Sequence, residues 1–172
     1  MSYVAEFEHH LKWAESLTQD VLQHAPPAAA AADRFRADLA GLLSTSYVAA
    51  LESCIKEIFN SFARSKSQLL ASVTSFHFDK INSAIHYNTI ADKYALQFGE
   101  PYRRKFRDLL KQEEEKVLAV DKTSMLEAYQ NLITWRHAFV HEGKKLASLD
   151  EVVLAFPLSK RLVMVLDSAM SP

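Results

Sequence analysis

Only three glycines and five prolines occur among the 172 residues of this chain. Sheet folds place glycine at many of their turns, because glycine adopts left-handed backbone conformations without a steric penalty. So few glycines argue against a β-sandwich or an open α/β sheet. Hydrophobic residues make up 49% of the chain and charged residues 24%, which excludes a disordered or low-complexity chain. The sequence predicts one all-α domain over residues 1–172, built from long helices with short connections.

Apolar residues recur at steps of three and four along most of the chain, the spacing of one helix face. The expected helices lie at about residues 2–23, 33–64, 68–73, 79–98, 101–120, 124–142 and 148–169. The second has an apolar stripe wide enough for contacts on several sides, so we expect it to be a long central helix. Gly143 falls at a predicted helix end, whereas Gly41 and Pro157 fall inside helical patterns. We expect the last helix to be bent or interrupted at Pro157.

The formal charge is nearly balanced, with 20 Lys and Arg against 21 Asp and Glu. Binding of a nucleic acid would therefore require a local basic patch or a partner subunit. Cys54 is the single cysteine and permits no internal disulfide, which fits a reducing compartment. No apolar run approaches the roughly 18 residues of a membrane span, and the N-terminal residues do not resemble a secretory signal. We expect a cytoplasmic protein that does not interact with a membrane.

A polar cluster interrupts the apolar pattern at residues 135–143. His137 and His141 are four residues apart and therefore share one face of a helix. Arg136 lies about 140° around the axis from His141 and roughly 7.5 Å along it. Its long side chain, which ends in a planar fork of donors, can still reach the histidines. The cluster combines a permanent cation with two side chains that titrate near neutrality.

Cleavage of an RNA phosphodiester by its own ribose 2′-OH requires a base, an acid and a cation that stabilises the charged transition state. In this interpretation His141 transfers a proton, Arg136 holds the phosphate oxygens, and His137 orients the site or the substrate. The scheme requires no metal and no other cofactor. Spacing alone leaves two alternatives: the histidines form a solvated or structural pair, or they bind a metal for which a third ligand is needed.

The segment Arg136-His137-Ala138-Phe139-Val140-His141 resembles the R-x-x-x-x-H motif of the HEPN superfamily. In that motif a polar residue follows the arginine, usually Asn and less often Asp or His. Residues 46–58 resemble the long central helix of the RiboL-PSP branch of stand-alone HEPN proteins, with its Leu-Glu-x-x-x-Lys-Glu segment at 51–57. The resemblance covers about residues 33–168. It implies a HEPN-like bundle of six to seven helices.

The resemblance also implies a metal-independent endoribonuclease that acts as a homodimer. Arg136 and His141 of both subunits would line one cleft and cleave RNA, with His137 in support. The implied setting is that of a toxin or an anti-phage effector, with an antitoxin or defence-system protein as a possible partner. The leading alternative is a non-catalytic HEPN module that dimerises and binds a protein or nucleic acid. A third is a helical scaffold in which the Arg–His cluster is structural.

Two further groups of side chains are candidates for the site. Glu52, at the edge of the central apolar stripe, either supports the motif or pairs with Lys56 four residues on. The candidate RNA-binding residues are Arg103, Arg104, Lys105, Arg107 and Lys111. Tyr102 and Phe106 are interleaved with these cations as possible stacking groups for bases. The alternative for this surface is a solvated face balanced by the glutamates at 113–115.

Overall fold

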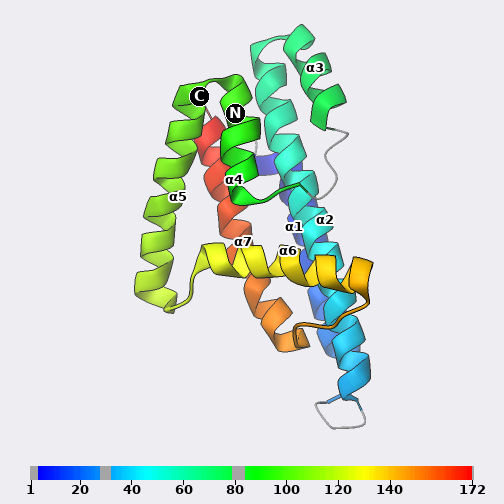
Figure 1. Cartoon of the computed structure of the whole chain (residues 1–172). Helices are drawn as coiled ribbons and strands as arrows, with labels where there is room; N and C mark the ends of the chain where they lie inside the picture. The colour runs from blue at the N-terminus through cyan, green and yellow to red at the C-terminus, as the bar shows by residue number, and fades with distance from the viewer. Residues whose placement is uncertain (1–3, 28–31, 79–83, 172) are drawn as a thin grey trace.

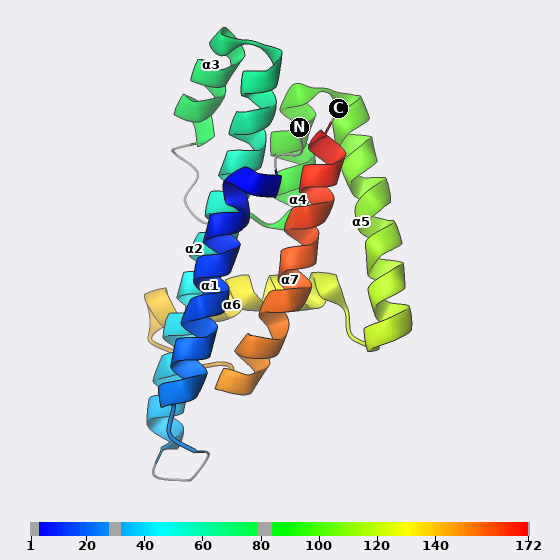
Figure 2. The ribbon, with the colours of Figure 1, turned by 180° about the vertical axis from the view of Figure 1, so that it is seen from behind.

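The computed structural model describes residues 4–27, 32–78 and 84–171, which form an all-α bundle (Figures 1 and 2). Its elements are α1 (Val4–His24), α2 (Asp33–Lys66), α3 (Gln68–Phe78), α4 (Tyr87–Thr89), η1 (Ile90–Tyr94), η2 (Ala95–Phe98), α5 (Glu100–Asp121), α6 (Met125–Glu142) and α7 (Leu149–Met170). The fold class predicted from the sequence is confirmed. Parts of the first predicted helix, of the connection after it and of the fourth predicted helix lie outside the described residues. Within the described ranges, none of the helices has both the length and the apolar character needed to cross a bilayer.

The long helix α2 forms the centre of the bundle, as its wide apolar stripe predicted. It contacts α1, α3, α6 and α7. Its buried side chains include Tyr47, Leu51 and Phe59, each fully shielded from solvent. Helix α6 crosses α2 and α7, so that its C-terminal end reaches the edge of the molecule (Figure 1). This crossing positions the polar cluster of residues 135–143 at the surface.

Side-chain caps define the ends of the two helices that carry and support the cluster. The Ser124 hydroxyl accepts from the backbone N–H of Glu127 and begins α6. Ser148 and Glu151 form a capping box at the start of α7. Helix α7 then continues through Pro157 without the predicted interruption. Proline has no N–H to donate, and Pro157 lies on the exposed side of the helix.

The helix predicted over residues 79–98 is not one regular α-helix in the described part of that range. Residues 84–86 are not helical, and a short α-turn, a π-helical turn and a 3₁₀ turn follow. Tyrosine hydroxyls take the backbone carbonyls that a helix would use: Tyr94 Oη donates to the Ala84 oxygen (2.9 Å) and Tyr129 Oη to the Ile85 oxygen (2.5 Å). Ile85 is fully buried. Burial of this side chain and the tyrosine hydrogen bonds together override the local helical pattern.

Asp167 of α7 is a buried carboxylate whose Oδ1 accepts no hydrogen bond from the described residues. The side chain is 4% exposed, and this burial raises its pKa. Because the folded state disfavours the ionised form, we expect Asp167→Asn to increase the free energy of unfolding at pH 7 by about 1 kcal/mol. Urea unfolding at pH 7 measures this difference.

The effect of Asp167→Asn has a defined pH dependence. Below the carboxyl pKa of the unfolded chain, about 3.9, Asp167 is protonated in both states and its charge has no effect on stability. As the pH rises through the raised folded pKa, the wild type loses stability relative to the variant. The advantage of Asp167→Asn should therefore be larger at pH 7 than at pH 4. An equal gain in the free energy of unfolding at both pH values would contradict a raised pKa of Asp167. The same pH-dependent gain in the exposed control Asp108→Asn would also contradict it.

Candidate functional site

Arg136 and His141 meet at the C-terminal end of α6. Arg136 Nη1 lies 3.4 Å from His141 Nε2, which confirms the reach that the sequence predicted across five residues. Arginine only donates hydrogen bonds, so His141 Nε2 must be the acceptor. In this state Nε2 carries a lone pair and the ring proton is on Nδ1. The pair thus presents a guanidinium directly beside a nitrogen that can take up a proton.

His137 extends the cluster along the same face of α6. Its ring centroid lies 4.8 Å from that of His141, and its Nε2 lies 4.0 Å from Glu142 Oε1. Lys144 Nζ contacts Glu142 Oε2 at 2.7 Å, and this hydrogen bond, more than the histidines, holds the pKa of Glu142 below its usual value. Glu142 is therefore an anion at neutral pH. The imidazoles lie between a cation, Arg136, and this anion.

The last turns of α6 are held against α2 by a close contact that the sequence interpretation missed. The ring of Phe139 packs directly on the backbone of Gly41, where a Cβ atom would overlap it. Ala138 beside it is buried. The sequence signal was a glycine inside a helical pattern, which is tolerated there when packing requires its small size. This contact fixes the rotation of the helix turn between Arg136 and His141.

The chain segment after the motif is also anchored. Gly143 has φ 64°, a left-handed conformation that favours glycine, and the N–H of Lys144 donates to the Ala138 carbonyl at 3.0 Å. The next residue, Lys145, forms an ion pair with Asp38 of α2. Helix α6 therefore ends sharply after the motif. This sharp end leaves the side chains of His137 and His141 exposed.

Glu52 pairs with Lys56, which was one of the two alternatives for this carboxylate in the sequence. Its Oε1 lies 2.7 Å from Lys56 Nζ, four residues on along α2. The Glu52 carboxylate also lies close enough to Tyr129 of α6 to raise the pKa of that phenol, although burial is the larger cause. Glu52 thus faces the interface between α2 and α6. A role in positioning the motif stays a prediction.

The basic cluster on α5 lies away from the motif. It occupies the first half of α5, at the opposite end of the molecule from the end of α6 (Figure 1). Arg103 pairs with Glu100 (2.7 Å) and Asp92 (3.3 Å), and Arg107 pairs with Asp92 (2.6 Å). The hydrogen bond from Arg107, above other causes, lowers the pKa of Asp92. Two of the five predicted RNA-binding cations are therefore neutralised by carboxylates.

The aromatic residues of this cluster are not placed for stacking with bases. Phe106 is fully buried in the core, so its predicted stacking role is wrong. Tyr102 packs edge-on against Phe62 with ring centroids 4.9 Å apart. Lys105 donates to the Ser171 carbonyl at 3.0 Å. Carboxylates balance part of this surface, but they are Asp92 and Glu100 and not the glutamates at 113–115 of the alternative, and RNA binding by the five cations stays a prediction.

The bundle and its cluster define a class: an all-α protein with a long central helix and an exposed Arg–His site at the end of its penultimate long helix. Residues 9–171 match the family model described as RiboL-PSP-HEPN, so the chain belongs to the RiboL-PSP-HEPN family. The matched range includes the whole cluster of residues 135–143. No curated protein and no solved structure matches the chain. In the part of the chain that the structure describes, no three His, Cys, Asp or Glu side chains converge as metal ligands.

Proposed function

We propose that this chain is an endoribonuclease that cleaves RNA without a metal, with Arg136 and His141 as its catalytic residues. The observation that carries the proposal is the 3.4 Å contact between Arg136 Nη1 and His141 Nε2 at an exposed helix end. A phosphate entering beside this pair would meet a fixed cation and a proton carrier together. Membership of the RiboL-PSP-HEPN family supports an RNA-related role.

The proposed reaction removes a proton from the 2′-oxygen, adds a proton to the 5′-oxygen and exchanges one P–O bond for another. Arg136 Nη1 moves from His141 Nε2 to the phosphate oxygens, the freed lone pair of Nε2 takes the proton of the ribose 2′-OH, and the 2′-oxygen forms a bond to phosphorus. The bond between phosphorus and the 5′-oxygen breaks, and an acid protonates that oxygen. Arg136 stabilises the additional negative charge on the phosphate oxygens. The products are a 2′,3′-cyclic phosphate and a free 5′-OH.

A second proton carrier is needed for the leaving oxygen. Within one protomer His137 lies beside His141, with Glu142 Oε1 4.0 Å from its Nε2, and could supply this proton. In a homodimer with two α6 ends facing across a two-fold axis, His141 of the partner subunit could serve instead. Such a dimer also doubles the positive charge around the phosphate while the whole molecule stays nearly neutral. We propose this dimer as the active form, and a toxin or an anti-phage effector, restrained by a partner protein, as its setting.

The second candidate function is a non-catalytic module that dimerises and binds a protein or nucleic acid. The neutralised cations of α5 favour its protein-binding form, because they do not form a continuous path for an RNA backbone. In this case the exposed Arg–His cluster would be part of a contact surface. The two candidates differ in whether RNA is cleaved.

Purified chain incubated with mixed RNAs distinguishes these functions. We expect cleavage that is unchanged in excess EDTA and leaves 2′,3′-cyclic phosphate ends, because the scheme uses side chains alone. End-group analysis by mass spectrometry, before and after acid treatment that opens the cyclic ester, identifies the product. RNA substituted with 2′-deoxy nucleotides is the control and should stay intact. Loss of cleavage in EDTA, or cleavage of the deoxy control, would contradict the proposed chemistry.

A further inference from the structure

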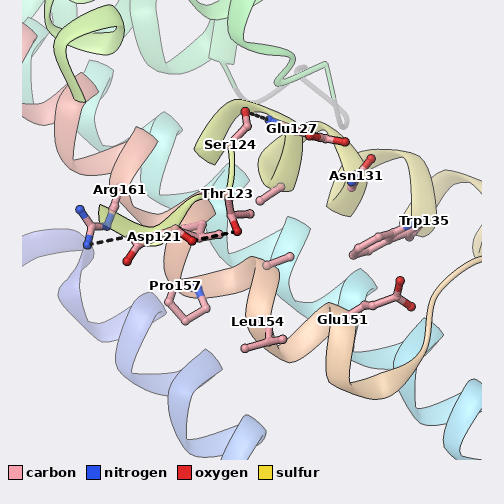
Figure 3. A pocket seen from close by; sticks show the side chains of 13 residues that line it. Asp121, Thr123, Ser124, Glu127, Asn131, Trp135, Glu151, Leu154, Pro157 and Arg161 are labelled. Atoms are coloured by element: carbon pink, nitrogen blue, oxygen red, sulfur yellow. Dashed lines mark hydrogen bonds and ion pairs between the residues drawn. The ribbon is translucent and has the colours of Figure 1, made fainter. Parts of the chain in front are cut away.

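A groove of about 670 Å³ lies between α6 and α7, apart from the side chains assigned to catalysis (Figure 3). Trp135 projects into it from α6, and Leu154 and Pro157 line it from α7. The end of α5 and the turn before α6 close its far end with Asp121 and Thr123. His141 lies about 120° around α6 from Trp135, so the groove and the motif occupy different faces of one helix.

The floor of the groove is apolar and accessible. Leu154 is 70% exposed, so its side chain is accessible to a binding partner. Pro157 is exposed beside it, and Leu158 and Trp135 are half-buried. Together these side chains form a continuous apolar strip bordered by polar groups. Such a strip is typical of a surface that binds another macromolecule.

The rim of the groove is acidic. Its carboxylates are Asp121, Glu127 and Glu151, and its cation is Arg161. Arg161 is already paired with Glu113 at 3.1 Å and lies 3.9 Å from Asp121. Hydrogen bonds from Ser148 hold the pKa of Glu151 below its usual value, so this carboxyl is ionised at neutral pH. The net charge facing the groove is negative.

We propose that the groove between α6 and α7 binds an amphipathic, basic segment of a partner protein. Its apolar side chains would pack on Trp135 and Leu154, and its lysine or arginine side chains would lie beside Glu127 and Glu151. Charge complementarity selects this occupant, because the carboxylates on the rim attract cations and disfavour anions. An aromatic anchor within an apolar strip, surrounded by a polar rim, matches the anatomy of protein interfaces.

The same charges disfavour the other occupants. An RNA backbone would bring phosphates against three carboxylates with one cation that is already paired. A second copy docked there by two-fold symmetry would bring two acidic rims into one interface, which is unfavourable for like charges. The groove also lies on a different face of α6 from His137 and His141. A bound partner would therefore be able to sit beside the proposed RNA site without blocking it.

Tryptophan fluorescence can report binding in the groove. The chain has two tryptophans, so Trp135 is the single tryptophan of the Trp13→Phe variant. The probe is a short fluorescein-labelled peptide with leucines at helical spacing and lysines at the other positions. We expect it to bind, to quench Trp135 emission, and to bind more weakly at high salt. The counterpart with glutamate in place of lysine should bind at least about tenfold more weakly.

Matched variants locate the binding. Glu127→Lys and Leu154→Ser should each lower the affinity for the lysine peptide by about tenfold or more. The control variants Glu115→Lys and Leu118→Ser, at exposed positions of α5 outside the groove, should leave this affinity unchanged. No binding of the lysine peptide, equal binding of both peptides, or equal effects of groove and control variants would overturn the proposal. Sedimentation adds a separate test. Conversion of a dimer to a monomer by Leu154→Ser would assign the groove to a second copy instead.

Discussion

His141→Ala is expected to lower the rate of RNA cleavage by about a thousandfold, because it removes the group that takes up the 2′-OH proton. Arg136→Ala should cost about a hundredfold or more, since the charge on the phosphate oxygens then has no fixed cation beside it. Arg136→Lys should recover part of this loss, as a lysine restores the charge but not the planar fork of donors. Single-turnover rates on one defined RNA give these ratios.

The controls for these variants separate catalysis from folding. His141 is exposed, so we expect His141→Ala to leave the free energy of unfolding and the oligomeric state unchanged within about 0.5 kcal/mol. His24→Ala makes the same substitution at another exposed position in the last turn of a helix, and its cleavage rate should equal that of the wild type. Full cleavage activity in both His141→Ala and Arg136→Ala would exclude these two residues as the catalytic pair. A large loss of stability in Arg136→Ala would instead indicate a structural cluster.

Gly41→Ala is expected to destabilise the fold by about 1–3 kcal/mol and to lower RNA cleavage at the same time. In a solvent-facing helix the change would stabilise by roughly 1 kcal/mol, because alanine has the higher helix propensity. Here the added methyl group overlaps the Phe139 ring, which must move out of its place between Arg136 and His141. The end of α6 then loses its fixed rotation. Chemical unfolding and the cleavage assay measure the two effects.

A double-mutant cycle isolates the contact between the two helices. Phe139→Ala alone should destabilise by removing the packing on Gly41, but adding Gly41→Ala to it should cost little, because the overlapping ring is gone. Ala49→Gly, at an exposed position of the same helix, calibrates the propensity effect and should cost about 1 kcal/mol. If Gly41→Ala instead stabilises the fold by about that amount, the packing of the Phe139 ring does not require a glycine at position 41.

The sequence was most informative where local chemistry defines local structure. Apolar periodicity located α2, α5, α6 and α7 to within a few residues. Gly143 was identified as a helix end from residue type alone, because glycine adopts the left-handed conformation that closes the last turn. The approach of Arg136 to His141 was likewise predictable, since both residues belong to one helix. Helical geometry sets their spacing whatever surrounds them.

Prediction failed where distant residues compete for the same groups. Residues 84–86 have a helical pattern, but tyrosine hydroxyls from η1 and α6 take two of their carbonyls. Phe106 lies among cations in the sequence and is buried in the core. Neither outcome follows from neighbouring residues, because the partners lie ten or more positions away. The neutralisation of Arg107 by Asp92 has the same origin.

The sequence by itself determined that this chain is an all-α bundle of the RiboL-PSP-HEPN family with an arginine and two histidines at one helix end. These properties depend on composition, periodicity and spacings of a few residues, which act within single helices. The tertiary structure alone decided how that helix end is held, through Phe139 on Gly41, and revealed the acidic groove between α6 and α7. Both depend on how helices cross, and the crossing is set by side chains that meet only after the chain has folded.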